Sequence, residues 1–359
     1  MNATMNKPEK TLMVMAGGTG GHVYPAMAVA DHLKRVGWNI VWLCTEGGME
    51  NRLIENKGYK KAMITMRGVR GKGLLGWLLL PVKLVKAFSQ SVSALRQHQP
   101  SVVLGMGGYV SFPGGMMAAL RGIPLVLHEQ NTIAGLANRV LGIVADRVLT
   151  GFPQVMRKGD WVGNPVRTEL AALPAPTFRY GERDGPLRIL VIGGSLGAQA
   201  LYENLPRALA LIPESERPEV MHQSGARHLQ ALQALYLSLG VKAHTVAFIT
   251  DMTAAYGWAD LVICRAGALT VAELAVCGIA SILVPFPSAV DDHQTSNARF
   301  LANAGAAILL PQNQLSPERL SDLKTLTRGQ LTQMAEKARD LARPEATVAV
   351  AKICEELAR

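Results

Sequence analysis

Aromatic side chains are scarce in this sequence of 359 residues, of which Phe, Trp and Tyr make up 5%. Proteins that bind single-stranded nucleic acid stack the bases on aromatic platforms, and the chain has few residues for such a surface. Cysteine is also rare, and no two cysteines form a C-x-x-C pair. Widely spaced cysteines are typical of reduced, buried thiols in a cytosolic protein. The four are Cys44, Cys264, Cys277 and Cys354.

Motifs for a bound metal ion and for a membrane-spanning segment are missing from the sequence. No D-x-D pair, H-E-x-x-H or paired C-x-x-C occurs, so we expect no metal cofactor. The first residues lack the pattern of a secretory signal. The apolar run 74–82 is broken by Gly76 and Pro81 and is too short to span a bilayer. We therefore expect a cytoplasmic protein without a spanning helix.

Acidic residues are absent between Glu55 and Glu129, a stretch that contains ten Lys and Arg residues. Residues 1–165 carry a net charge of +11 and the remainder −1. Such a one-sided positive field attracts a polyanion, either nucleic acid or an anionic bilayer. Apolar residues in the same stretch favour a bilayer contact, although a buried helix with a solvated basic face would give the same pattern. The expected membrane patch comprises Leu74, Leu75, Trp77, Leu78, Leu79, Lys72, Lys83 and Lys86.

Short β-branched runs alternate with helical patterns, which is typical of parallel sheets with crossover helices. The halves also resemble each other: residues 12–21 and 189–197 each combine an apolar strand, a glycine-rich turn and a helix start. We predict an α/β fold of two doubly wound domains, with a ligand cleft at the carboxyl ends of the strands. The expected strands are 11–16, 39–44, 101–104, 124–127 and 147–150, then 187–192, 219–223, 241–248, 261–264 and 280–284.

The first glycine-rich turn, 17–22, ends at His22. Glycines allow a ligand to approach the backbone, and free N–H groups at a helix start favour phosphate. The turn lacks the dinucleotide fingerprint, because Val23 occupies the position of its third glycine, and no P-loop motif occurs. Histidine titrates near neutral pH, so His22 is a candidate general base. The alternative is a histidine that only caps the turn or binds phosphate.

The second glycine-rich turn, 193–197, matches the G-x-S-x-G nucleophile elbow of serine hydrolases. Asp260 and His293 follow Ser195 in the order that such a triad requires. The turn is nonetheless nearly a copy of the one at Thr19, which has no such partners. Binding of phosphate or acceptor explains both turns, and a serine hydrolase remains the alternative.

Further polar segments follow other expected strands. In the first half these are the loop 105–111 and residues 128–131, which with Asn138 are expected to line one wall of the cleft. In the second half, residues 264–273 start a helix of small side chains, in which Glu273 can accept from ribose hydroxyls or complement the helix N-terminus. Residues 291–297 form another polar cluster.

Taken together, these segments resemble glycosyltransferase family 28, and within it the bacterial MurG family of UDP-N-acetylglucosamine transferases. The resemblance implies a GT-B fold, in which residues 1–165 bind acceptor and membrane and residues 166–341 bind the donor. It also implies a C-terminal helix within about 342–359 that packs back on the first domain. The matching stretches, in order over nearly the whole chain, are GGTGGHVYPAMAVA, GMGGYVSFPGG, HEQNTIAGLANR, VGNPVR, GGSLGAQALYENLP, CRAGALTVAEL and DDHQTSNA.

The activity implied by the resemblance is an inverting hexosyl transfer in peptidoglycan synthesis, which supports cell shape and division. N-acetylglucosamine would move from UDP-N-acetylglucosamine to the C4 hydroxyl of the muramoyl sugar in lipid I, giving lipid II and UDP. The implied location is the cytoplasmic face of the inner membrane, on an anionic surface, in contact with a cell-wall synthesis complex and without nucleic acid. A related GT-B transferase with another lipid or glycoside acceptor is the alternative.

The resemblance also implies which residues meet the substrates. On the acceptor side they are His22, Tyr109, Glu129 and Asn138; that His22 takes the proton of the acceptor hydroxyl is our hypothesis from the chemistry. The sequence departs from the family pattern at Thr295, which leaves the contacts around Gln294 open. The implied donor contacts are Thr19, Gly20, Gly21, Asn131, Arg167, Ser195, Ile249, Ala268, Leu269, Thr270, Val271, Ala272, Glu273 and Gln294.

Overall fold

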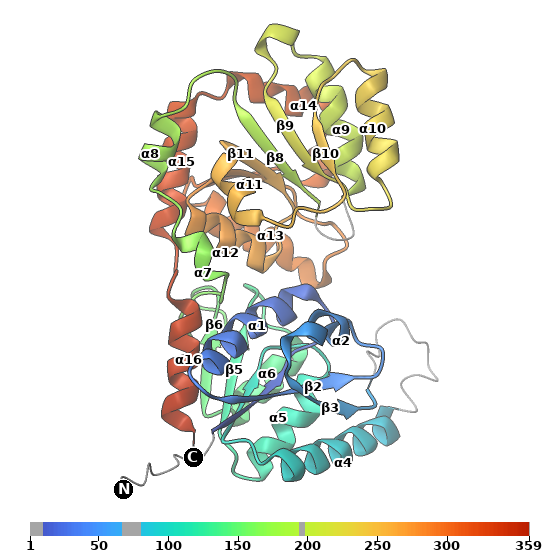
Figure 1. The fold of residues 1–359 in the computed structure, drawn as a ribbon, viewed down its shortest axis with the longest axis vertical. Coiled ribbons are helices and arrows are strands. Elements are labelled where there is room, and N and C mark those ends of the chain that lie inside the picture. Colours follow the sequence, from blue (N-terminus) through green and yellow to red (C-terminus); the bar gives the residue numbers. More distant parts are fainter. Residues whose placement is uncertain (1–9, 67–79, 194–197, 359) are drawn as a thin grey trace, which may run out of the picture. The chain divides into compact units, whose positions relative to one another are not determined.

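The computed structural model describes residues 10–66, 80–193 and 198–358. The chain forms two compact units, which are shown in Figure 1. The N-terminal unit comprises Met1–Val166 and Pro344–Arg359, and the C-terminal unit comprises Arg167–Arg343. The boundaries expected from the sequence fell after residues 165 and 341.

A seven-stranded parallel sheet forms the centre of the N-terminal unit, in the order β3-β2-β1-β4-β5-β6-β7. Its central strands carry almost only apolar side chains because both faces are covered, as is usual for parallel sheets. The strands are β1 (Thr11–Met15), β2 (Asn39–Thr45), β3 (Lys60–Ile64), β4 (Val102–Gly105), β5 (Leu125–Glu129), β6 (Arg147–Thr150) and β7 (Gly159–Trp161).

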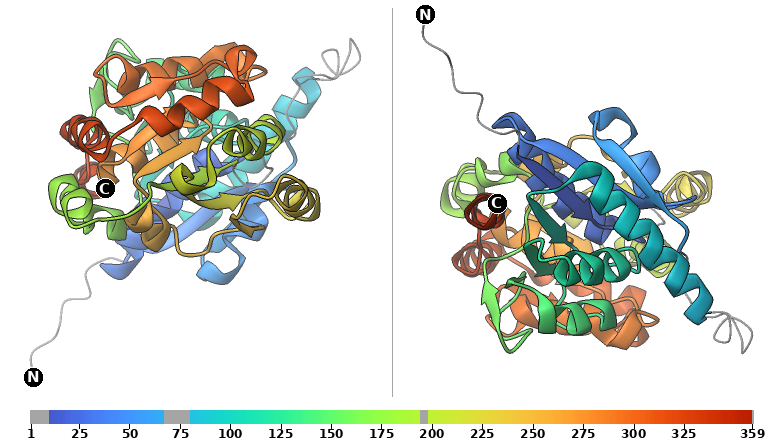
Figure 2. Two further views of the ribbon diagram at one scale, coloured as in Figure 1. Left: turned by 90° about the horizontal axis from the view of Figure 1, so that it is seen from above. Right: turned by 90° about the horizontal axis from the view of Figure 1, so that it is seen from below.

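Helices cover both faces of this sheet (Figures 1 and 2). Leu12 and Val14 of β1 pack in one apolar cluster with α1 (Gly20–Arg35) and α16 (Ala346–Leu357). Met13 and Met15 face the opposite side and pack in a second cluster. The helices of this second face are α4 (Leu80–His98), α5 (Ser111–Leu120) and α6 (Leu136–Val144), while α2 (Met49–Leu53) follows β2.

The C-terminal unit contains a six-stranded parallel sheet in the order β10-β9-β8-β11-β12-β13. The strands are β8 (Arg188–Ile192), β9 (Glu219–Gln223), β10 (His244–Val246), β11 (Leu261–Cys264), β12 (Ala280–Leu283) and β13 (Ala307–Leu309). The helices are α7 (Thr168–Ala171), α8 (Pro176–Gly181), α9 (Gln199–Ala210), α10 (Leu229–Ser238), α11 (Met252–Trp258), α12 (Ala268–Cys277), α13 (His293–Ala302), α14 (Pro317–Ser321) and α15 (Arg328–Asp340).

The predicted α/β class with two doubly wound sheets is confirmed. All ten expected strands form, although β10 is shorter than the expected 241–248. Three strands were not predicted: β3, β7 and β13. Each lies at or beside the edge of its sheet and is short or partly exposed, so its sequence lacks the continuous apolar run of a buried strand.

Both sheets reverse their strand order at one point, between β1 and β4 in one unit and between β8 and β11 in the other. At such a switch point the following loops diverge to opposite faces and leave a crevice beyond the carboxyl ends of the strands. The described loops at these positions are 16–19 and 106–110 in the N-terminal unit and 265–267 in the C-terminal unit. The two loops of the N-terminal unit contain glycine-rich motifs.

Asp260 is a fully buried carboxylate of the C-terminal unit that pairs with Arg183 and Arg328. Its Oδ2 also accepts a hydrogen bond from the Arg188 backbone, 2.9 Å away. Asp260→Ala should lower the free energy of unfolding by about 3–5 kcal/mol, because it leaves buried positive charge uncompensated. Urea denaturation followed by circular dichroism measures this. Asp160→Ala, which removes an exposed pair with Arg147, is the control and should cost less than about 1 kcal/mol.

Candidate active site

The two glycine-rich loops of the N-terminal unit are in direct contact. Gly108 has φ +84°, and a Cβ atom there would lie 2.3 Å from the carbonyl oxygen of Gly17, so no other residue fits. The Ser111 hydroxyl donates to the Met15 carbonyl at 2.7 Å and ties the second loop to the end of β1. The expected loop 105–111 therefore lies against the turn 17–22.

The start of α1 presents unpaired backbone donors. The side chain of the N-cap residue, Thr19, does not cap the helix. Within the described parts of the chain, no acceptor pairs with the N–H groups of Gly20 and Gly21. These groups and the positive end of a 16-residue helix suit a phosphate or another anionic group.

Glu50 holds the base of this turn and was not expected from the sequence. It is fully buried, and its Oε1 accepts from the backbone N–H and the hydroxyl of Thr45, at 2.9 and 2.8 Å. Its Oε2 lies 3.5 Å from the N–H of Gly18. Tyr109 reaches the same group, with its hydroxyl 3.4 Å from the Thr45 hydroxyl. No sequence motif marks Glu50, because its partners are brought together only by the fold.

Glu129 and Asn138 form a second buried group at the end of β5. Glu129 is 1% exposed and accepts from the backbone N–H groups of Asn131 and Gly135, at 2.9 and 3.1 Å. It also accepts from Asn138 Nδ2 at 2.8 Å. Both carboxylate oxygens are thus engaged in holding the loop to α6. The Oδ1 atom of Asn138 is buried and has no partner within the described residues.

His22 lies in the first turn of α1 and is partly exposed. Its Nδ1 atom is 2.7 Å from the Oε1 atom of Gln130, a residue that is 1% exposed. The ring also lies against the second glycine-rich loop, since a Cβ atom at Gly107 would be 3.0 Å from its Nδ1 and Cε1 atoms. The structure therefore brings His22 together with the residues after β4 and β5. From the sequence, Gln130 was expected only to line one polar wall of the cleft.

In the C-terminal unit, Glu273 lies in the second turn of α12 and is 7% exposed. Its Oε2 accepts from the Tyr256 hydroxyl at 3.0 Å, and its Oε1 lies 3.7 Å from Arg167 Nη2. Burial raises the pKa of Glu273, and the Arg167 charge and the Tyr256 hydroxyl oppose that rise. Unlike Glu129, this carboxylate accepts no backbone hydrogen bond within the described residues, which leaves it capacity for a ligand hydroxyl.

The other expected donor contacts that the structure describes in this unit lie around the carboxyl ends of its sheet. Ala268, Leu269, Thr270, Val271 and Ala272 form the first turns of α12, whose N-cap is Gly267. The N–H of Ile249 donates to Gln223 Oε1, and Gln294 Oε1 accepts from the N–H of Phe286, both at 2.9 Å. Ser195 lies outside the described residues, as do Lys72, Leu74, Leu75, Trp77, Leu78 and Leu79 of the membrane patch.

The structure does not support the serine hydrolase alternative, because Asp260 lies at the amino end of its strand, whereas the elbow motif requires residues that meet at the carboxyl ends. Asp260 immediately precedes β11, and its N–H donates to the carbonyl of Arg188, the first residue of β8. Four strand steps of about 3.3 Å separate Arg188 from Ile192, the last residue of β8, so Asp260 lies roughly 13 Å from the carboxyl end of that strand. The Asp260 carboxylate also forms ion pairs with Arg183 and Arg328.

Comparison with known families assigns both halves of the chain. Residues 12–150 match the glycosyltransferase family 28 N-terminal domain, and residues 188–355 match the glycosyltransferase family 28 C-terminal domain. The chain belongs to glycosyltransferase family 28. The resemblance found in the sequence is thereby confirmed.

Relatives in glycosyltransferase family 28 match the chain over nearly its full length. The UDP-N-acetylglucosamine--N-acetylmuramyl-(pentapeptide) pyrophosphoryl-undecaprenol N-acetylglucosamine transferase of Dechloromonas aromatica (strain RCB) is 61% identical over 350 residues, 98% of this chain and 99% of its own. The enzyme of the same name from Azoarcus sp. (strain BH72) is 60% identical over 350 residues, 97% and 98% of the two chains.

Solved structures support the same assignment of the fold. The crystal structure of Acinetobacter baumannii MurG superposes with a TM-score of 0.85 at 43% identity, covering 97% of this chain and 99% of that one. The glycosyltransferase of kitacinnamycin has a TM-score of 0.72 at 15% identity, covering 98% and 100%, and so resembles this family 28 member in fold alone. The two doubly wound units are a GT-B fold, as expected.

The buried state of Glu273 predicts a pH dependence of stability. The pKa of Glu273 is raised in the folded state, so ionising it there costs free energy. The folded wild type should therefore lose stability as the pH rises from about 4.5, the ordinary pKa of the group, through the raised pKa. Glu273→Gln carries no titrating proton. Its free energy of unfolding relative to wild type should therefore increase across this window, measured by urea denaturation between pH 4 and 8. Glu216→Gln, at an exposed position, is the control, and a flat difference for Glu273→Gln would contradict the assignment.

Proposed function

We propose that this chain transfers N-acetylglucosamine from UDP-N-acetylglucosamine to the C4 hydroxyl of the muramoyl sugar in lipid I, giving lipid II and UDP. The observation that carries the proposal is the full-length identity of 58–61% to several enzymes whose names state this donor and acceptor. The fold supports it, because the N-terminal unit places two glycine-rich loops at the switch point of its sheet.

The reaction requires one proton acceptor. An α-linked donor and a β-linked product mean a single in-line displacement, in which the acceptor oxygen attacks as it loses its proton. We assign the base role to His22, which is partly exposed in the first turn of α1. Tyr109 and Asn138 lie in the same unit, where we expect them to contact the acceptor. Glu129 acts as a positioning residue, since its carboxylate holds the backbone of the neighbouring loop.

The departing UDP carries negative charge that must be stabilised. Arg167 is about half exposed, and α12 is a ten-residue helix that begins after Gly267. A guanidinium and a helix N-terminus are both suited to a diphosphate. Glu273, held between Tyr256 and Arg167, is suited to ribose hydroxyls. We propose that these groups act without a bound metal ion, which predicts that EDTA leaves the rate unchanged.

The first experiment is release of UDP from UDP-N-acetylglucosamine in the presence of a lipid I analogue. Acceptor-dependent release supports the proposal, and release only with another lipid or glycoside acceptor would replace its acceptor while keeping the enzyme class. His22→Gln should lower kcat about 100-fold or more with little change in KM, because general base catalysis contributes roughly that factor. An unchanged kcat would show that His22 is not the base.

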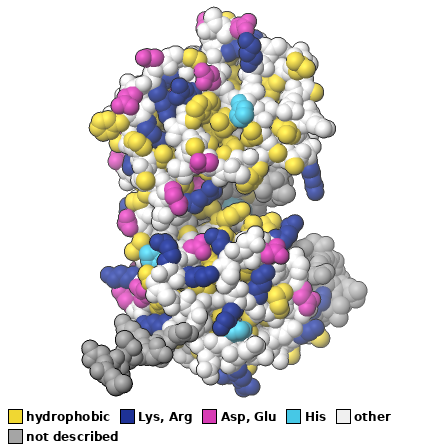
Figure 3. All heavy atoms as spheres, in the orientation of Figure 1, with side chains coloured by type: hydrophobic (Ala, Val, Ile, Leu, Met, Phe, Trp, Pro, Cys, Tyr) yellow, Lys and Arg dark blue, Asp and Glu magenta, His cyan; other side chains and the backbone are white. Residues whose placement is uncertain are grey.

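We further propose that the N-terminal unit binds an anionic membrane surface. On α4, Val82 and Val85 are 69% and 67% exposed, and Lys83 and Lys86 lie on the same outer side. On the face drawn in Figure 3, this unit carries more Lys and Arg than Asp and Glu side chains. No helix of the described residues is long and apolar enough to cross a bilayer. These features favour attachment to the cytoplasmic face of the inner membrane.

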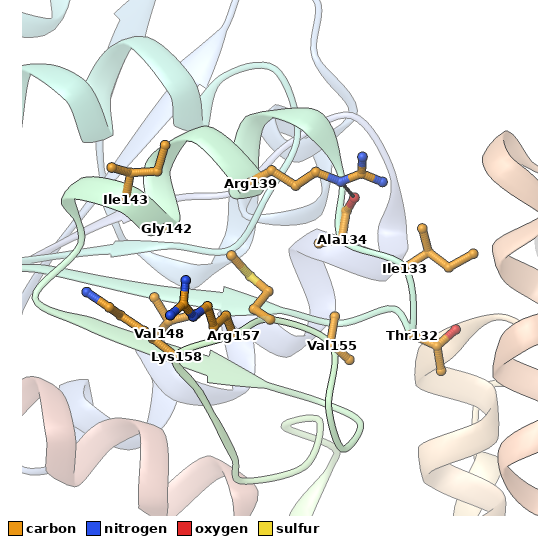
Figure 4. Close-up of a pocket in the computed structure, with 11 residues that line it drawn as sticks. Thr132, Ile133, Ala134, Arg139, Gly142, Ile143, Val148, Val155, Arg157 and Lys158 are labelled. Atoms are coloured by element: carbon orange, nitrogen blue, oxygen red, sulfur yellow. Dashed lines mark hydrogen bonds between the residues drawn. The ribbon is translucent and has the colours of Figure 1, made fainter.

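A pocket of about 570 Å³ beside α6 is also lined by basic and apolar side chains. Figure 4 shows Arg139 and Ile143 extending from α6, and Val155, Arg157 and Lys158 extending from the segment before β7. No acidic residue lines it, and no carboxylate of the described residues pairs with its three cations. Ile143 is 80% exposed. The pocket therefore suits the phosphate and upper chain of an anionic lipid.

Removing two basic residues of α4 should weaken binding to vesicles. A Lys83→Gln, Lys86→Gln double variant should bind phosphatidylglycerol-containing vesicles about 30-fold less well in a sedimentation assay, since each basic residue near an anionic surface contributes about 1 kcal/mol. UDP affinity should not change. Lys242→Gln with Lys324→Gln, two exposed positions of the C-terminal unit, is the control. Equal vesicle binding by both double variants would rule out α4 as the contact.

A further inference from the structure

A chain of side-chain hydrogen bonds links the His22 ring to a backbone carbonyl of the same unit. Gly163 O lies 2.9 Å from His128 Nε2, and His128 Nδ1 lies 3.0 Å from Gln130 Nε2. Gln130 Oε1 lies 2.7 Å from His22 Nδ1. His128 and Gln130 are 0% and 1% exposed, so water does not compete for their polar atoms.

The carbonyl at one end fixes the proton on His128. A carbonyl oxygen can only accept, so His128 Nε2 must donate to Gly163 O. Burial lowers the pKa of His128 to about 4, and its contacts with Gly163 and Glu129 only partly oppose this, so the ring is neutral at pH 7. A neutral imidazole carries one proton. Its Nδ1 is therefore an acceptor.

Two acceptors of His128, its Nδ1 atom and its backbone carbonyl, fix the orientation of the Gln130 amide. Its Nε2 donates to His128 Nδ1 and also lies 3.0 Å from the backbone oxygen of His128, which can only accept. The reversed amide would place its oxygen against both acceptors. The backbone of Gln130 is itself held by Asn164 Nδ2, which donates to its carbonyl at 3.0 Å. Oε1 must then point to His22.

We infer that Gln130 and His128 set the tautomer of His22, with its proton on Nδ1 and a free lone pair on Nε2. Oε1 has no proton to give, so the contact of 2.7 Å requires His22 Nδ1 to be the donor. No residue of the described chain occupies Nε2. A histidine without such a partner in water favours the proton on Nε2, so the chain reverses the ordinary preference. Gln130 and His128 are positioning residues, because they act through His22.

The inference deepens the proposed function and rests on it for the role of the base. In the transfer, the C4 hydroxyl proton moves to Nε2 as the oxygen bonds to the anomeric carbon of the donor. The bond from that carbon to the UDP oxygen breaks, and its electron pair leaves with UDP. His22 becomes an imidazolium whose Nδ1–H still donates to Gln130, so no proton must move along the chain. The opposite tautomer would direct its Nε2–H at the C4 hydroxyl and could not accept the proton of that hydroxyl.

Long-range ¹H–¹⁵N NMR of the whole protein, labelled on histidine ring nitrogens, tests the tautomer directly at pH 8. The His22 signals, assigned from their loss in His22→Gln, should show a protonated Nδ1 and an unprotonated Nε2, and those of His128 the reverse. This wild-type spectrum needs no folded variant of Gln130. A protonated Nε2 on His22 would overturn the inference.

Gln130→Leu tests the cause, because leucine removes both amide groups at similar volume. The His22 proton should shift toward Nε2, and kcat should fall about 100-fold while KM for each substrate changes less than about twofold. Gln90→Leu is the matched control. Gln90 accepts from Thr65 N at 2.7 Å and donates to the Thr65 hydroxyl at 3.1 Å, and its helix, α4, lies on the other face of the sheet from α1.

The outcomes separate the two proposals. A Gln130→Leu variant with an unchanged His22 tautomer, or with kcat equal to that of Gln90→Leu, would overturn the positioning role. Protonated Nδ1 in the wild type together with an undiminished kcat for His22→Gln would instead refute the base assignment, and leave the tautomer in place.

Discussion

The close contact between the two glycine-rich loops of the N-terminal unit is the constraint on which the candidate site depends. The carbonyl of Gly17 occupies the position where any residue at 108 other than glycine would place its Cβ. The Ser111 hydroxyl and the Met106 N–H both bond to the carbonyl of Met15, so the second loop is anchored to β1. This arrangement brings the start of α1, and with it His22, against the residues that follow β4 and β5.

Buried carboxylates divide into those that build the scaffold and one that retains capacity for a ligand. Glu50, Glu129 and Asp260 each accept from backbone N–H groups, and their partners fix loop or strand ends. Glu273 is also buried, but its described partners are one phenol and a guanidinium 3.7 Å away. A buried carboxylate with few donors is costly to ionise, and a hydroxyl-bearing ligand supplies the missing hydrogen bonds. The contrast is visible only in the contacts, since all four are single acidic residues in the sequence.

The polar side chains around His22 show how backbone geometry can determine side-chain chemistry. Two carbonyl groups that can only accept determine the direction of every hydrogen bond between Gly163 and His22. Burial keeps His128 neutral, so the chain has a single consistent arrangement of protons. The residues of this chain come from three segments far apart in the sequence, which explains why Gln130 carries no recognisable signal of its own.

The sequence alone determined the fold class, the family, and the positions of the main glycine-rich turns, because these depend on local hydrophobic patterns and on motifs contiguous in the chain. Buried strands such as β1 and β8 have continuous apolar runs and were located nearly to the residue. The edge strands β3, β7 and β13 were not, since their side chains meet solvent and follow no such pattern. Only the tertiary structure decided that Glu129 holds a loop, that Asp260 pairs with two arginines at the amino end of its strand, and that Gln130 faces His22. These depend on distances between residues remote in the sequence, which no local pattern encodes.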